Sequence, residues 1–149
     1  MRQKTLVVAI VVSVLFLMTS ALAQNRTFIG ADKCRICHKV EHTSWATTKH
    51  AKALESLKPE EQKKKECVEC HTTGAKNELP GVQCEACHGA GSEYKTMSIM
   101  KDKQKAIAAG LIIPTEKVCV QCHNKKSPTF KGFDWTEMSK KVHDKKKKA

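Results

Sequence analysis

The pattern Cys-x-x-Cys-His occurs four times in this chain and uses every one of its eight cysteines. The pattern is typical of covalent c-type haem attachment, in which two thiols add to the porphyrin vinyl groups and the adjacent His ligates the iron. The sequence therefore predicts four molecules of haem c. The expected attachment residues are Cys34, Cys37, Cys67, Cys70, Cys84, Cys87, Cys119 and Cys122, and the expected proximal iron ligands are His38, His71, His88 and His123.

Three other uses of paired cysteines fit this pattern less well. A zinc site does not require His directly after the second Cys and suits an exported chain poorly. An iron–sulfur centre favours a run such as Cys-x-x-Cys-x-x-Cys, which the sequence lacks. A thioredoxin-like site needs one motif between a strand and a helix, not four motifs. Because no cysteine is left over, we expect neither a disulfide nor a nucleophilic thiol.

The first 23 residues have the features of a secretory signal peptide. Arg2 and Lys4 precede an apolar run from Leu6 to Met18, and Ala21-Leu-Ala23 forms a cleavage pattern. The apolar run is shorter than the roughly 20 residues that a spanning helix needs, although an uncleaved anchor is the alternative. We expect a signal peptide at 1–23, a tetrahaem domain at 24–149, no membrane span after cleavage, and a periplasmic or otherwise extracytoplasmic location.

The length of the expected domain limits its fold. A compact chain of this size has a radius of gyration of roughly 14 Å, so four porphyrins inside it must lie close together. Aromatic residues make up only 5% of the chain, and the haems must therefore form much of the apolar core. We predict a mainly α fold, with short helices and loops wrapped round four covalently attached haems and little or no β structure. Helices are expected near 44–57, near 93–109, and after a capping Asp134 that is followed by Glu137.

The formal charge of +12 does not indicate nucleic-acid binding. No DNA-binding motif is present, and about eight haem propionates would offset most of the basic excess. Lys63–Lys65 and Lys145–Lys148 are either solvated charge or docking patches for an acidic redox partner.

The chain has fewer histidines outside the motifs than expected irons. Outside the motifs the chain has three histidines, His42, His50 and His143, so at least one of four irons lacks a distal His from its own chain. We expect His50 and His143 to be distal ligands. His42 follows His38 by four residues and would point to the same side of a helix, so it would serve another haem or none.

Methionine is the other candidate for a sixth ligand. Met97, Met100 and Met138 could each ligate an iron, and a Met/His pair would raise the potential of that haem. The alternative for each is ordinary packing in an irregular apolar gap.

Several segments together resemble the tetrahaem cytochrome c-554 family, first associated with nitrifying bacteria. The first motif is followed by Ser44-Trp45 and by His50-Ala-Lys-Ala-Leu-Glu-Ser-Leu-Lys-Pro59, which are similar to the helix after the first haem in that family. The other segments are Cys67 to Gly74, Gly81-Val-Gln-Cys-Glu-Ala-Cys-His88-Gly-Ala-Gly91, and Phe133-Asp134 with Glu137-Met138 leading to His143.

The resemblance implies a mainly helical wrap with closely stacked haem pairs, three of the haems with two His ligands and one five-coordinate. It implies that His50 and His143 are distal ligands and that the second haem, at His71, is the open one. The chain departs from the family in being shorter and in lacking a His after Gly91. Met97, Met100 or His42 replaces that ligand, or a second iron is open.

We therefore expect an exported tetrahaem electron carrier that works between other redox proteins, rather than an enzyme. The first alternative is a reductase of a small ligand such as nitric oxide or hydroxylamine at an open iron. The second is a subunit docked in a larger multihaem conduit. All four motifs end in His, which argues against the Lys-ligated haem of some nitrite reductases.

Overall fold

The computed structural model describes residues 25–74 and 79–145, where nearly all regular structure is short helix. The expected signal peptide and Lys146–Lys148 lie outside the described residues. The α-helices are α2 (Ala31–Arg35), α3 (Lys39–Trp45), α4 (Lys65–Val68), α5 (Cys84–His88), α6 (Met97–Met100), α7 (Lys103–Ala108), α8 (Glu116–Cys119) and α9 (Trp135–Met138). The 3-10 helices are η2 (Leu54–Ser56) and η3 (Ser139–Lys141). The predicted mainly α fold is confirmed.

A minimal sheet is the exception to the helical structure. β1 (Thr72–Thr73) pairs antiparallel with β2 (Leu79–Pro80), with Thr72 opposite Pro80 and Thr73 opposite Leu79. This pairing brings the exit of the second motif to the entrance of the third. No helix in the part of the chain that the structure describes is long and apolar enough to cross a membrane.

Each haem motif begins on a helical turn. Cys34, Cys67 and Cys119 lie in α2, α4 and α8, and α5 consists of the third motif alone. In the first and fourth motifs the His N–H donates to the carbonyl of the first Cys, at 3.0 Å for His38 and 2.9 Å for His123. One turn of helix thus sets the first thiol and the imidazole on the same side of the backbone.

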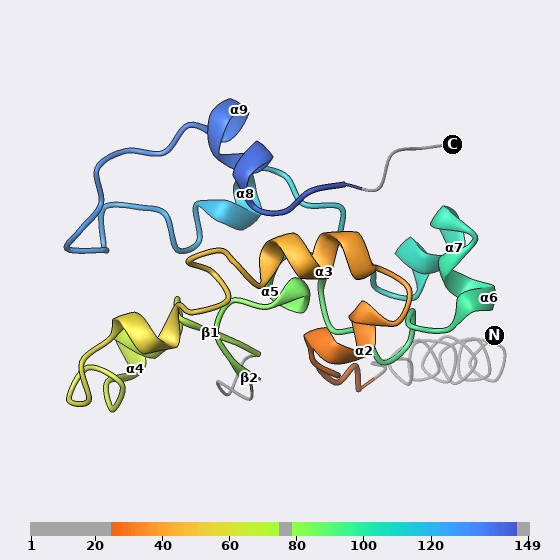
Figure 1. The fold of residues 1–149 in the computed structure, drawn as a ribbon, viewed down its shortest axis with the longest axis horizontal. Helices are drawn as coiled ribbons and strands as arrows, with labels where there is room; N and C mark the ends of the chain where they lie inside the picture. The colour runs from red at the N-terminus through yellow and green to blue at the C-terminus, as the bar shows by residue number, and fades with distance from the viewer. Residues whose placement is uncertain (1–24, 75–78, 146–149) are drawn as a thin grey trace, which may run out of the picture.

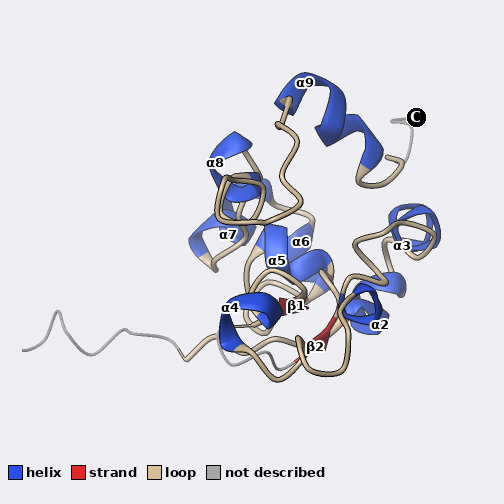
Figure 2. Cartoon of the chain, turned by 90° about the vertical axis from the view of Figure 1, so that its left-hand side faces the viewer, coloured by secondary structure: helices blue, strands red, loops and turns tan. Residues whose placement is uncertain are grey.

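The third motif lies at the centre of the molecule. Both views place α5 between α4 on one side and α2 on the other, with α9 at the upper edge (Figures 1 and 2). α2 packs directly on α5. The Gln83 side chain, just before α5, accepts a hydrogen bond from the Ala31 N–H at 2.7 Å and so holds the start of α2.

Few apolar side chains of the described chain are buried against one another. The buried apolar residues are Ala31, Ala53, Val68, Tyr94 and Ala106, while Ile36 is 79% exposed. Other large apolar side chains are also exposed, among them Val40, Met97, Ile107, Ile112, Ile113, Val120 and Met138. Such a small protein core agrees with the expectation that apolar side chains pack on porphyrins.

The predicted helix at 44–57 is wrong. α3 begins earlier, at Lys39, and ends at Trp45. The hydroxyls of Thr47 and Thr48 donate to the carbonyls of Ser44 and Trp45 at 2.8 and 2.7 Å, which satisfies these carbonyls without further helical turns. The chain then runs through turns to η2, and this leaves His50 in a loop.

The predicted helix at 93–109 is also wrong, because it is divided into α6 and α7. Asp102 begins α7, and its side chain accepts hydrogen bonds from the N–H groups of Gln104 and Lys105 at 3.0 and 3.1 Å. The cap predicted at Asp134 is confirmed, since its carboxylate accepts from the Glu137 N–H at 3.1 Å. The helix after Asp134 is short, so His143 lies beyond it.

We predict that Thr73→Val destabilises the fold. Thr73 is 1% exposed, and its hydroxyl donates to the Gly81 carbonyl and accepts from the Gln83 N–H, both at 2.8 Å. Valine keeps the shape but leaves both backbone groups unpaired, which costs about 2 kcal/mol of unfolding free energy. Thermal unfolding of the holoprotein measures the loss. Thr136→Val, at an exposed position of α9, is the control and should leave the midpoint nearly unchanged.

Candidate functional site

The cysteines of different motifs lie against one another. The thiols of Cys34 and Cys84 are in contact, and this contact together with burial raises the pKa of Cys34 far above its usual range. The first motif is therefore adjacent to the third. This agrees with the packing of α2 on α5.

The fourth motif is adjacent to both the third and the second. Burial raises the pKa of Cys87 to about 11, and the neighbouring Cys119 adds to the shift. Burial also raises the pKa of Cys122 to about 12, with a further contribution from its contact with Cys70. Through these cysteine interactions the motifs are linked in a row, in the order first, third, fourth, second, which differs from their order in the sequence. The third motif also approaches the second, because α5 contacts β1.

Two histidines outside the motifs pair with motif histidines. The ring centroids of His50 and His123 are 5.9 Å apart, and those of His143 and His88 are 6.4 Å apart. His nitrogens bind transition metals at about 2 Å, so two imidazoles on opposite sides of one metal have ring centroids about 6 Å apart. Both pairs therefore have the spacing of two axial ligands of one iron.

Burial also favours the neutral, metal-binding form of one imidazole in each pair, His50 and His88. It lowers the pKa of His50, and the charge of His123 lowers it further. Burial likewise lowers the pKa of His88, with smaller effects of the same sign from His143 and His38, although a hydrogen bond with the Ile112 carbonyl at 3.1 Å opposes the shift. A lower pKa leaves the imidazole neutral at physiological pH, and the neutral ring is the form that binds a metal.

The loop that carries His50 is fixed by the segment that leads into the third motif. The Val82 N–H donates to the His50 carbonyl at 2.9 Å, and the Trp45 indole N–H donates to the Val82 carbonyl at 2.9 Å. Gly81 has a φ of +75°, and a Cβ built there would lie 2.5 Å from the Ala51 carbonyl oxygen. Only glycine permits this close approach.

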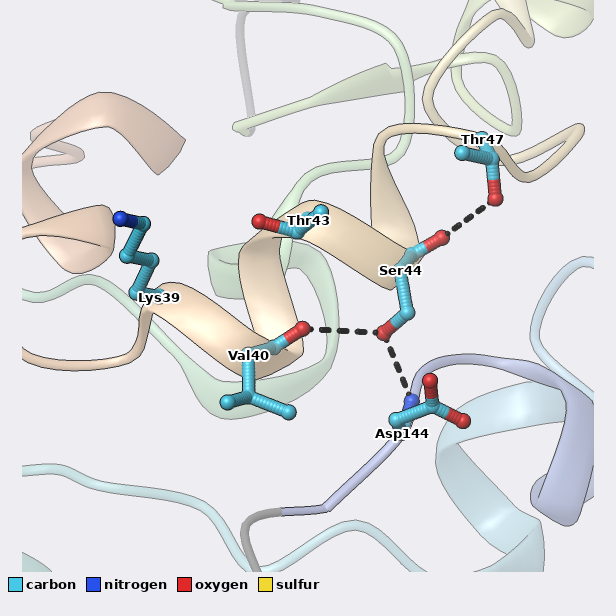
Figure 3. A pocket seen from close by; sticks show the side chains of 6 residues that line it. All are labelled: Lys39, Val40, Thr43, Ser44, Thr47 and Asp144. Atoms are coloured by element: carbon cyan, nitrogen blue, oxygen red, sulfur yellow. Dashed lines mark hydrogen bonds between the residues drawn. The ribbon is translucent and has the colours of Figure 1, made fainter.

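The C-terminal segment that carries His143 is attached to α3. The Asp144 N–H donates to the Ser44 hydroxyl oxygen at 2.7 Å, and the Ser44 hydroxyl lies 3.2 Å from the Val40 carbonyl (Figure 3). A groove of about 530 Å³ runs along this contact. Its lining residues are Lys39, Val40, Thr43, Ser44, Thr47 and Asp144.

The other two motif histidines have no imidazole partner. All seven histidines lie within the described residues, and neither His38 nor His71 has another imidazole at such a distance. The Nδ1 of His71 lies 2.7 Å from the Ala53 carbonyl oxygen and 3.3 Å from the Ser56 hydroxyl. A carbonyl at Nδ1 leaves Nε2 as the atom available to a metal.

The structure does not bring the remaining candidate ligands to a motif histidine. The His42 ring lies 5.3 Å from that of Trp45, with Nε2 3.9 Å from an Asp32 carboxylate oxygen. Met97 is the first residue of α6 and is 61% exposed. Met100 ends α6, and Met138 is an exposed residue that ends α9.

Sequence reasoning missed two residues that organise the site. Glu85, inside the third motif, is buried and binds the backbone before α2. The signal in the sequence is an acidic residue between two cysteines that are expected to attach a porphyrin, because an unpaired charge is costly beside an apolar ring. Phe133 stacks on His123, with ring centroids 5.2 Å apart and an interplanar angle of 27°.

The residues present fit haem c. Within the described ranges, no group of three or more His, Cys, Asp or Glu could hold a metal ion with protein ligands alone. A porphyrin supplies four nitrogens to its iron, so a haem needs only one or two ligands from the protein. Four Cys pairs on helical turns, two of them with facing imidazole pairs, match that requirement.

Comparison with known proteins agrees with this fit. A family model described as cytochrome c554 and c-prime matches residues 33–89. Cytochrome c-554 of Nitrosomonas europaea is 33% identical over 166 aligned residues, which cover 85% of this chain and 69% of the relative. The solved structure of reduced cytochrome c554 from Nitrosomonas europaea matches with a TM-score of 0.63 at 28% identity, covering 79% of this chain and 84% of that one.

We predict that Gly81→Ala displaces His50 and weakens its pairing with His123. The new Cβ would meet the Ala51 carbonyl, which belongs to the same loop as His50. Electron paramagnetic resonance of the ferric protein should show a new high-spin signal. Gly132→Ala is the matched control, because its φ of +102° gives similar backbone strain while nothing lies within 4 Å. The control should lose only about 1 kcal/mol of stability and keep the spectrum; identical spectra for both variants would contradict the prediction.

Proposed function

The chain belongs to the cytochrome c-554 family of c-type cytochrome electron carriers, and from this premise we propose that it is an exported tetrahaem carrier. The observation that carries the proposal is the facing of His50 with His123 and of His143 with His88 at 5.9 and 6.4 Å. Such pairs suit six-coordinate haems that change oxidation state without exchanging ligands.

The protein sets the positions of the haems and supplies ligands to their irons. Haem c, when bound, supplies one-electron chemistry at its iron. The contacts of Cys34 with Cys84 and of Cys70 with Cys122, together with the proximity of Cys87 to Cys119, support one row of four haems. In this row the first and second haems are the ends, so we propose that electrons enter at one of them and leave at the other.

The proposed ligand sets differ among the haems, numbered here by their motifs. We assign His50 to the fourth haem and His143 to the third. For the first haem we propose Met97, because hydrogen bonds between Ser92 and Thr27 lay the segment before α6 beside the segment before α2. His42 is left as a residue that packs on Trp45.

The proposed partners are other redox proteins, and the proposed location is outside the cytoplasm. Lys63–Lys65 are exposed, and their segment carries a similar number of acids, so we propose that they are solvated charge rather than a docking patch. These acids are Glu60, Glu61, Glu66 and Glu69. Lys65 itself pairs with Glu69 at 3.6 Å.

A second candidate function is the binding and reduction of a small ligand at the second haem. The observation that favours it is the environment of His71, whose Nδ1 is held by the Ala53 carbonyl while no imidazole of the chain faces the ring. An iron with one free axial position can bind nitric oxide or a similar molecule. Reduction would also require a proton donor near that position.

We predict that His50→Ala and His143→Ala each convert one low-spin haem to high spin, because each removes one axial imidazole. Met97→Ala should convert a third. Electron paramagnetic resonance of the ferric protein, combined with a haem count by mass spectrometry, measures the change. His42→Ala is the control and should keep the wild-type signals. A wild-type spectrum in the His50 and His143 variants would rule out the proposed ligand sets.

We also predict that the wild-type protein has one high-spin haem that nitric oxide converts to a different signal. The reason is the free position opposite His71. Titration of the ferric protein with nitric oxide, followed by the same resonance, tests this. Four low-spin haems that do not respond would exclude the second candidate function, and loss of the high-spin signal on concentration would instead favour a ligand from another copy of the chain.

A further inference from the structure

Glu85 is a buried carboxylate that the carrier function described above does not use. It is 2% exposed and lies in α5, between the two cysteines of the third motif. One oxygen accepts from the Gly91 N–H at 2.7 Å and the other from the Gly30 N–H at 2.8 Å, while the Ile29 N–H lies 3.0 Å from both oxygens. Both oxygens thus act as acceptors, as in an ionised carboxylate.

This carboxylate lies between the attachment points of the first and third haems. It neighbours Cys84 in sequence, and it binds the N–H of Gly30, whose carbonyl is 3.7 Å from the Cys34 sulfur. Contact with Cys84 and burial raise the pKa of Cys34, and the charge of Glu85 adds to the shift. Since both sulfurs would be bonded to porphyrin carbons, a charge near both sulfurs is near both porphyrins.

No cation balances this charge through an ion pair among the described residues. The ion pairs of this part of the chain involve Asp32, Glu69, Asp102 and Glu137. The Glu85 charge is stabilised instead by backbone N–H groups, whose dipoles offset the cost of burial. A buried charge is screened by salt much less than an exposed one.

We propose that Glu85 is a positioning residue that also sets the potentials of the first and third haems. Its hydrogen bonds hold the backbone before α2 against α5, and this fixes the two attachment sites relative to each other. Its negative charge stabilises ferric iron, which carries one more positive charge than ferrous iron, and so lowers the midpoint potentials of these two haems. This inference rests on the proposed tetrahaem function.

The experiment compares Glu85→Gln, which removes the charge, with Glu85→Asp, which keeps the charge but draws it back from the Gly30 and Gly91 amides. Glu69→Gln is the matched control, because it makes the same change in the second motif at a side chain that is 54% exposed. Each holoprotein is studied by a spectroelectrochemical redox titration that resolves individual haems, and by thermal unfolding. Haem content is counted first by the pyridine haemochrome assay.

We expect Glu85→Gln to shift the midpoint potentials of two of the four haems upward and to leave the other two unchanged. Glu69→Gln should shift none of the four. Glu85→Asp should lower the unfolding temperature but keep all four potentials close to wild type. Unchanged potentials in Glu85→Gln, or an equal shift of all four, would overturn the inference.

If Glu85→Gln does not incorporate its haems, the Glu85→Asp variant alone tests the inference. An upward shift of the midpoint potentials in this variant, which keeps the charge, would overturn the inference. A wild-type haem count below four would instead overturn the proposed tetrahaem carrier, so that the two failures are distinguishable.

Discussion

The contacts of the third motif are the interaction on which the rest of the structure depends. Within the described residues, Cys84 touches Cys34 of the first motif, and Cys87 lies near Cys119 of the fourth. Glu85 binds the backbone before α2, and His88 faces His143 from the C-terminal segment. The described part of the chain buries few large apolar side chains, so contacts of this kind take the place of a large protein core in relating the first, third and fourth motifs to one another.

The residues that face the motif imidazoles come from loops, not from long helices. His50 is held by the Val82 N–H, and His143 by the hydrogen bond between Asp144 and Ser44. The segment that carries each of these imidazoles is thus held by a hydrogen bond to another segment, with the Val82 N–H in one case and with the Ser44 side chain in the other. This arrangement explains how a small protein with little regular structure places imidazoles about 6 Å apart, as two axial ligands of one iron require.

The two ends of the row of motifs differ from its middle. The third and fourth motifs have facing imidazoles, whereas His38 and His71 have none. Transfer of electrons and binding of a small ligand place opposite demands on an iron, because the first favours fixed ligation and the second a free position. A chain that has both kinds of motif, with and without a second imidazole, can combine electron transfer with the binding of a small ligand at one end of the row.

The sequence by itself determined the chemistry, because haem attachment depends on short covalent spacings such as Cys34 to His38. It also predicted the mainly α fold and the Asp134 cap, and the assignment of His50 and His143 as distal iron ligands stays a prediction. Only the tertiary structure decided which motifs are neighbours and which imidazoles pair. Those relations depend on hydrogen bonds between residues far apart in the chain, such as Glu85 with Gly30 and Ser44 with Asp144. The helix predicted at 44–57 from local pattern is wrong because the Thr47 and Thr48 hydroxyls bind the carbonyls at the end of α3, and because the His50 carbonyl accepts from the distant Val82 N–H as well as from the Ala53 N–H.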